Sequence, residues 1–198
     1  GVIQVFTRRG KGNAGVRGRA RIGAGSHGLR EASAGLDLRG ARGGVGLDLG
    51  HQSTDGIDSC RGIGAPWYAG CGMDNPDPDR DGYRNNNVSL RADFAASEAW
   101  QFEAQGLRAR GHNFFDADPA WGLPDNSKVL QQVVGGSVRY RPSQALGLRL
   151  TVGRNIDASD NHLGATYMDR FETRRDSASL QGDFVVADGQ VLTAGFDW

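Results

Sequence analysis

One short polar segment carries the side chains that could do the most specific chemistry. Asp77, Asp79 and Asp81 alternate with other residues, Asp74 precedes them, and Gly82 follows directly. Hard cations such as calcium take six to eight oxygen ligands, and alternating carboxylates before a turn-forming glycine supply several from one loop. The segment therefore predicts a calcium site, although a solvated acidic turn would have a similar composition.

The spacing of this segment differs from that of an EF-hand loop. A twelve-residue count from Asp77 places Val88 where an EF-hand carries its bidentate glutamate. Oxygen ligands from other segments must therefore complete the shell around the cation.

Two cysteines, Cys60 and Cys71, lie in the same polar stretch and would close a short ring. In an exported protein such a pair forms a disulfide, which loop-closure entropy predicts to contribute about 3 kcal/mol. We predict this disulfide, with two free thiols as the alternative.

The elements that must position these residues are joined by connections of two lengths. Short turns lie at residues 39–42, 96–98, 142–144 and 187–189. After a short first hairpin, the other connections are long and polar, at residues 51–84, 112–128 and 157–171. Short turns toward the periplasm and long loops toward the exterior are typical of a transmembrane β-barrel. This wiring predicts that the acidic segment, the cysteines and all four histidines lie on the outer side.

The runs between these connections predict β-strands with one apolar and one polar face. Leu47 and Leu90 belong to alternations in which successive side chains point to opposite faces. Runs of about ten residues suit a tilted strand across a bilayer better than the five or six of ordinary sheets. The sequence predicts an all-β fold, an antiparallel up-and-down transmembrane β-barrel. We expect nine strands, at residues 13–25, 29–39, 42–51, 85–95, 99–111, 129–141, 145–156, 172–186 and 190–198.

The odd strand number predicts a piece of a larger barrel. Bacterial single-chain barrels have even strand numbers, and the predicted last strand runs toward the outer face. Open strand edges are not tolerated in lipid, so we expect further strands to complete the barrel.

Aromatic residues on the apolar face predict an interfacial girdle close to the short turns. They are Phe94, Trp100, Phe102 and Tyr140. The packed end of a soluble sandwich would be the alternative.

Composition excludes several other classes of protein. The 198 residues include 31 glycines, about twice the usual share, and glycine inside a strand marks a bend or a close approach. No stretch approaches the roughly 18 consecutive apolar residues of a transmembrane helix. A formal net charge of zero gives no argument for nucleic-acid binding.

Several segments, taken in order, carry a resemblance to a known family. Residues 1–10 (GVIQVFTRRG) resemble the last plug strand of the TonB-dependent outer-membrane transporters. The later segments are residues 79–83 (DRDGY), 114–116 (FFD), 123–125 (LPD), 135–140 (GGSVRY) and 194–198 (AGFDW). Together they resemble the cobalamin (vitamin B12) transporters of this superfamily. The resemblance implies a barrel of about 22 strands with a plugged lumen. Residues 1–10 would end the plug domain, and residues 11–198 would form the N-terminal part of the barrel domain.

The resemblance also implies a function in the bacterial outer membrane. It implies TonB-dependent uptake of cobalamin or a similar scarce organometallic ligand, with calcium-ordered outer loops that capture the substrate. TonB would act through plug segments outside this sequence, and outer-membrane lipid would surround the barrel. The implied calcium ligands are Asp79, Asp81, Asp116 and Asp125, together with Asp55 or Asp58, of which we predict Asp58.

Two other classes of protein share parts of this pattern. A small closed outer-membrane barrel, a hydrolase or an adhesin, would require the strand at 13–25 to pair with that at 190–198. A soluble calcium-dependent carbohydrate-binding β-sandwich would show the same alternation. A hydrolase would need an acid or base at the barrel mouth. The sequence shows no nucleophile motif near His27, His51, His112 or His162. We therefore predict a transporter rather than an enzyme.

Overall fold

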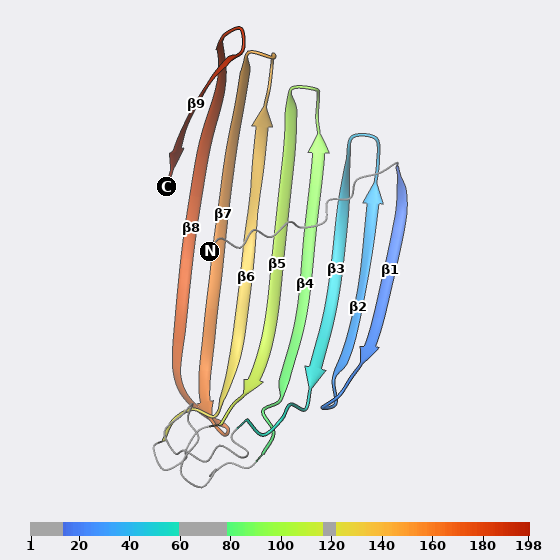
Figure 1. Ribbon diagram of the computed structural model, residues 1–198, viewed down its shortest axis with the longest axis vertical. Coiled ribbons are helices and arrows are strands. Elements are labelled where there is room, and N and C mark those ends of the chain that lie inside the picture. Colours follow the sequence, from blue (N-terminus) through green and yellow to red (C-terminus); the bar gives the residue numbers. More distant parts are fainter. Residues whose placement is uncertain (1–13, 60–78, 117–121) are drawn as a thin grey trace.

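The computed structural model describes residues 14–59, 79–116 and 122–198. In these parts of the chain nine strands form one antiparallel sheet in the order of the sequence (Figure 1). They are β1 (Gly15–Ala24), β2 (Arg30–Arg39), β3 (Gly43–Thr54), β4 (Tyr83–Ala95), β5 (Trp100–Phe114), β6 (Asn126–Tyr140), β7 (Leu146–Leu163), β8 (Thr166–Ala187) and β9 (Gln190–Asp197). The all-β fold and the up-and-down order of nine strands are confirmed. Among the described residues, no helix is long and apolar enough to cross a membrane.

Some predictions fall outside the described residues. They are the assignment of residues 1–10 to a plug domain, the disulfide between Cys60 and Cys71, and the part of the predicted calcium segment that contains Asp74 and Asp77. All three stay predictions.

The connections lie at two opposite ends of the sheet. The turns β2–β3, β4–β5, β6–β7 and β8–β9 are at the upper end of Figure 1, and all four were predicted as short turns. The opposite ends of the strands lie at the lower end of Figure 1, which we call the long-connection end. The four histidines belong to the strand ends or the turn at this end, as predicted.

The predicted long connection at residues 157–171 is wrong. β7 continues to Leu163 and β8 starts at Thr166, with a tight turn at Gly164, whose φ is 55°. Asp160 pairs with Arg170 in the ladder, which is interrupted by one register shift nearby. Polar residues occupy both faces of this hairpin and interrupt the apolar alternation, so its sequence resembles a loop. A strand needs apolar side chains only where one of its faces meets an apolar environment, and paired backbone can extend beyond that region.

The sheet has one apolar and one polar face. Directly paired residues of neighbouring strands share a face, so Leu36, Leu47 and Leu90 lie in one row of the apolar face. Leu90 is 52% exposed and Val134 51%, and Ala158 is the one buried apolar side chain in the described part of the chain. No second sheet covers the apolar face among the described residues, so the structure gives the β-sandwich alternative no support. A contiguous exposed apolar surface of this kind marks an interface with lipid or with another molecule.

The predicted aromatic residues do gather at the short-turn end of the apolar face. Phe94 is paired with Phe102, and Trp100 with Tyr140. The ring centroids of Trp100 and Tyr140 are 4.3 Å apart, and those of Trp100 and Phe102 are 6.1 Å apart. The aromatic cluster therefore forms one edge of the apolar face.

The two edge strands do not close the sheet. β1 pairs with β2 and β9 pairs with β8, and among the described residues β1 and β9 do not pair with each other. The small closed barrel required that pairing, so the structure gives it no support. The observed sheet is an open piece of barrel wall.

Candidate functional site

Three of the predicted calcium ligands meet at the long-connection end. Asp79 and Asp81 precede β4, and Asp116 follows β5, the antiparallel partner of β4. The Phe114 N–H donates to the Gly82 carbonyl oxygen at 2.9 Å, so backbone contact between the two segments continues toward the carboxylates. The three carboxylates each contribute an oxygen atom to a group whose members lie within 4.8 Å of one another. We call Asp79, Asp81 and Asp116 the acidic cluster.

The segment that directly follows β3 holds Asp81 in place. The Asp81 N–H donates to the Ile57 carbonyl at 2.9 Å, and its Oδ2 accepts the Ser59 N–H at 2.9 Å and the Ser59 hydroxyl. Gly56 has a φ of 72°, and a Cβ there would lie 1.9 Å from the Asp81 carbonyl oxygen. Only glycine fits this contact without displacing the backbone.

The chemistry of the acidic cluster is that of a site for a hard cation. Asp81 and Asp116 are half-buried and Asp79 is exposed. Asp81 Oδ1 is buried and accepts no hydrogen bond from the described residues. Neighbouring carboxylates repel one another when all are ionised, and a divalent cation between them would offset that repulsion. Bidentate binding by three carboxylates would approach the six to eight oxygens that calcium takes.

The other predicted ligands lie outside this group of three. Both oxygens of Asp125 accept the Gly164 N–H at 2.9 Å, and Oδ1 also accepts from Asn126 Nδ2 at 2.6 Å. Asp125 thus ties the start of β6 to the turn between β7 and β8. Asp55 and Asp58 follow β3, on the segment whose Ser59 contacts Asp81.

The polar face carries a second arrangement of charges, which sequence reasoning did not predict. Arg19, Asp37, Asp48 and Arg91 come from β1, β2, β3 and β4. Arg91 pairs with Asp37 at 2.9 Å and with Asp48 at 2.6 Å, and Arg19 pairs with the same two carboxylates. Each cation therefore contacts both anions, and we call the four residues the ionic quartet.

Glycines beneath the ionic quartet make room for it. A Cβ at Gly46 would lie 2.6 Å from Asp37 Oδ1 and 2.9 Å from Arg91 Nε. A Cβ at Gly35 would lie 2.5 Å from Asp48 Oδ1. The side chains of the ionic quartet therefore lie across strand positions that have no side chain of their own. This gives two of the many strand glycines a specific packing reason.

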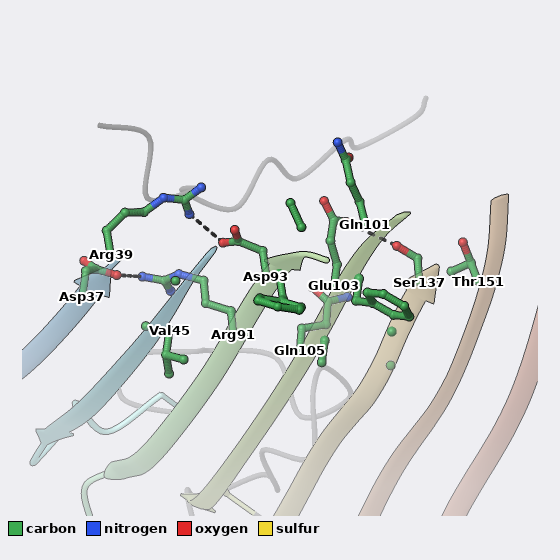
Figure 2. Close-up of a pocket in the computed structure, with 18 of the residues that line it drawn as sticks. Asp37, Arg39, Val45, Arg91, Asp93, Gln101, Glu103, Gln105, Ser137 and Thr151 are labelled. Atoms are coloured by element: carbon green, nitrogen blue, oxygen red, sulfur yellow. Dashed lines mark hydrogen bonds and ion pairs between the residues drawn. The ribbon is translucent and has the colours of Figure 1, made fainter. Parts of the chain in front are cut away.

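Charged and polar side chains continue along the polar face toward the short turns. Figure 2 shows them rising from neighbouring strands around a concave region of about 790 Å³. Arg39 pairs with Asp93 at 2.7 Å, and Glu103 accepts hydrogen bonds from Ser137 at 3.3 Å and from Arg149 at 3.5 Å. The signal for these pairs was present in the sequence, as charges at alternate positions opposite the apolar residues. Their partners depend on strand register, which the alternation does not give.

Fold and site together define the class of protein as an up-and-down antiparallel β-barrel, of which the chain forms part of the wall. The inner face of this wall is charged, and a group of carboxylates lies at its long-connection end. No protein-family model matches the chain. The chain is similar to the vitamin B12 transporter BtuB of Photobacterium profundum, with 26% identity over 121 residues. The match covers 61% of this chain and 20% of that protein, so the chain spans about a fifth of the relative's length. The similarity to this type of transporter that the sequence predicted is confirmed.

Proposed function

We propose that the chain is part of the barrel wall of an outer-membrane transporter for vitamin B12 or a similar scarce organometallic ligand. The observation that carries the proposal is the similarity to a vitamin B12 transporter over 61% of the chain. The fold supports it independently, because the open sheet exposes an apolar face suited to lipid and a polar face suited to a lumen.

In this proposal the protein does no chemistry on its substrate. The long connections capture the ligand outside the cell, and the polar face lines the lumen. TonB supplies energy through a plug domain, of which residues 1–10 would be the end. Further strands would join the exposed edges of β1 and β9 to close the barrel, because open edges cannot face lipid.

We further propose that the acidic cluster binds calcium and thereby orders the long connections. The grouping of Asp79, Asp81 and Asp116 supports this, as does the buried Oδ1 of Asp81. Asp58 is the proposed further ligand, because it lies beside the Ser59 that already contacts Asp81. Asp125 stays a predicted ligand, although its carboxylate is engaged by Gly164.

The test of transport is saturable binding of cyanocobalamin by the native protein in isolated outer membranes. We expect binding that strengthens when calcium is added and weakens when a chelator removes it. No saturable binding with or without calcium would reject the proposed substrate. Cyanocobalamin binding that is the same with and without calcium would support the transport function but contradict the proposed role of the acidic cluster.

The test of the metal site is calcium titration of the purified protein by calorimetry. Loss of outer-shell partners alone commonly weakens metal sites 10- to 100-fold, so Asp81→Asn should weaken calcium binding by at least about tenfold. The matched control is Asp188→Asn, the same change in the turn between β8 and β9, at the opposite end of the sheet. Equal calcium affinity in the two variants would show that the acidic cluster is not the calcium site.

A further inference from the structure

Toward the long-connection end, the residues on the apolar face change from apolar to polar. The first polar residue on that face of β3 to β8 marks where its apolar part ends on each strand. These residues are His51, Asn86, Arg108, Gln132, Arg154 and Asp176. His51 and Asn86 are paired, so the transition lies in the same row on β3 and β4. On β5 and β6 it lies one row closer to the short turns, and on β7 and β8 it lies a further row closer. A membrane surface crosses the rows of a barrel in this oblique way, because barrel strands are tilted.

At this transition and beyond it, four cations lie together on three neighbouring strands. They are Arg84 on β4, Arg108 and Arg110 on β5, and Lys128 on β6, and we call them the basic patch. Arg84 and Lys128 are each paired with His112, in one row. Residues two apart on a strand are separated by about 7 Å, so the four cations occupy a compact area.

The basic patch borders the apolar part of the same face directly. Arg108 is paired with Val88, and the next row toward the short turns contains Leu90 and Val134. A ligand that lay across this transition would meet cations at one end and apolar side chains at the other.

The basic patch lacks the anions that balance neighbouring cations. All four of its cations are exposed, and in the described part of the chain none of them forms an ion pair. The acid nearest in register is Asp160, paired with Lys128 in the ladder, and it already binds Arg170 at 2.9 Å.

The cations of β7 and β8 on the same face differ in this respect. Arg154 forms a double contact with Asp176, and Arg170 and Arg174 share Glu172. From β4 to β8, the excess positive charge at this height is therefore confined to β4, β5 and β6, and on the other side of β3 the exposed Arg30 of β2 lies in the same row as Arg84.

We propose that the basic patch binds the phosphorylated headgroup of an outer-leaflet lipid, whose acyl chains cover the adjoining apolar side chains. Phosphate oxygens match the forked donors of Arg108 and Arg110, and charge-assisted contacts of this kind are the strongest hydrogen bonds that proteins make. The adjoining apolar surface distinguishes this partner from a soluble anion or an acidic protein. The inference rests on the proposed outer-membrane location but does not depend on the transported substrate.

The experiment titrates the detergent-purified full-length protein by native mass spectrometry. The probes are a diphosphorylated glycolipid, the same glycolipid without phosphates, and inorganic phosphate. The test variant is Arg108→Gln with Arg110→Gln. The matched control is Arg170→Gln with Arg174→Gln, which removes the same charge from the same face where anions balance it. A second variant, Arg84→Gln with Lys128→Gln, tests the patch independently if the first variant does not fold.

We expect the wild type to prefer the diphosphorylated lipid, and either patch variant to lose about tenfold in affinity, because each replaces two charged donors. The control variant should stay within about twofold. Equal binding of both lipids, or equal losses in patch and control variants, would overturn the proposal. If inorganic phosphate bound the patch as strongly as the diphosphorylated lipid does, the patch would be a site for a soluble anion, and the lipid proposal would be overturned. Cyanocobalamin binding by the same samples separates this outcome from failure of the proposed transport function.

Discussion

The carboxylate of Asp125 accepts the backbone N–H of Gly164, with each oxygen 2.9 Å from the nitrogen. Asn126 reinforces the contact, because its Nδ2 donates to the Gly164 carbonyl at 3.0 Å. Two adjacent residues at the start of β6 therefore hold both polar backbone groups of the glycine in the β7–β8 turn. This turn closes the hairpin of the two longest strands, and the contacts fix its position against β6.

The first prediction concerns this anchor. Asp125→Ala removes both acceptors for the Gly164 N–H, and a hydrogen bond to a charged group is worth about 1.5–3 kcal/mol. We expect amide hydrogen exchange at residues 164–166 to accelerate by about tenfold or more, with the middle of the sheet unchanged. Asp188→Ala in the β8–β9 turn is the matched control. Unchanged exchange in Asp125→Ala would show that the ladder alone fixes the turn.

The second prediction concerns the ionic quartet. Gly46→Ala would place a Cβ 2.6 Å from Asp37 Oδ1, so the ion pairs must separate or shift. Overpacking of this kind costs about 1–3 kcal/mol, and the partial exposure of the four side chains places the effect toward the lower value. We expect a lower thermal unfolding temperature in detergent, followed by circular dichroism. Gly18→Ala is the control, because a Cβ there meets nothing within 4 Å.

A double variant separates steric strain from the ion pairs themselves. Arg91→Met removes one cation, so Gly46→Ala should cost less stability in that background than in the wild type. Additive losses would mean that Gly46 acts through the backbone and not through the quartet.

The strands themselves were predictable because alternation and turn signals agree along most of the chain. Leu47 and Leu90 each sit in a run with one apolar face, and the register pairs them directly. The ends of β7 and β8 were not predictable in this way. Around Asp160 and Arg170 polar residues occupy both faces and no regular apolar alternation continues, so hairpin and loop have similar sequences.

The candidate sites were predictable to different degrees. The spacing of Asp79 and Asp81 indicated a cation site, and the resemblance added Asp116, which the structure brings beside them. The ionic quartet was missed, because Asp48 contacts Arg91 only in one strand register. The contact of Asp125 with Gly164 could not be foreseen, because the turn that contains Gly164 was itself not predicted.

The third prediction concerns the acid sensitivity of β8. Glu172 lies beyond the apolar part of its face, and hydrogen bonds from Arg170 and then Arg174 hold the pKa of its carboxyl below the ordinary glutamate value. A carboxyl whose pKa is lower in the folded state stabilises the fold above its unfolded pKa. That contribution is lost as the pH falls through the folded pKa.

We therefore expect hydrogen exchange around residues 170–174 to accelerate, relative to the rest of the sheet, as the pH falls below about 4. Glu172→Gln should remove this pH dependence, because it has no carboxyl to protonate. The relevant measurement compares protection factors corrected for the intrinsic pH dependence of exchange. A wild type and a Glu172→Gln variant with identical acid profiles would contradict the role of Glu172.

The fourth prediction concerns removal of the proposed metal. The acidic cluster joins the segment before β4 to the segment after β5, so one bound calcium would restrain both. Chelation should therefore accelerate hydrogen exchange at residues 79–82 and 115–116 together, and calcium should restore both. Magnesium should restore them poorly, because it demands near-ideal octahedral geometry and keeps several of its waters.

Asp81→Asn is the decisive variant for this coupling. Its amide can still accept the Ser59 hydrogen bonds that hold the segment, but it loses the charge that a calcium ligand supplies. In this variant we expect both segments to exchange as fast with calcium as the wild type does after chelation. In Asp188→Asn, calcium should slow exchange in both segments as it does in the wild type. If chelation loosened residues 79–82 alone, Asp116 would not be a ligand. If Asp81→Asn still responded to calcium in both segments, the ion would bind elsewhere in the long connections.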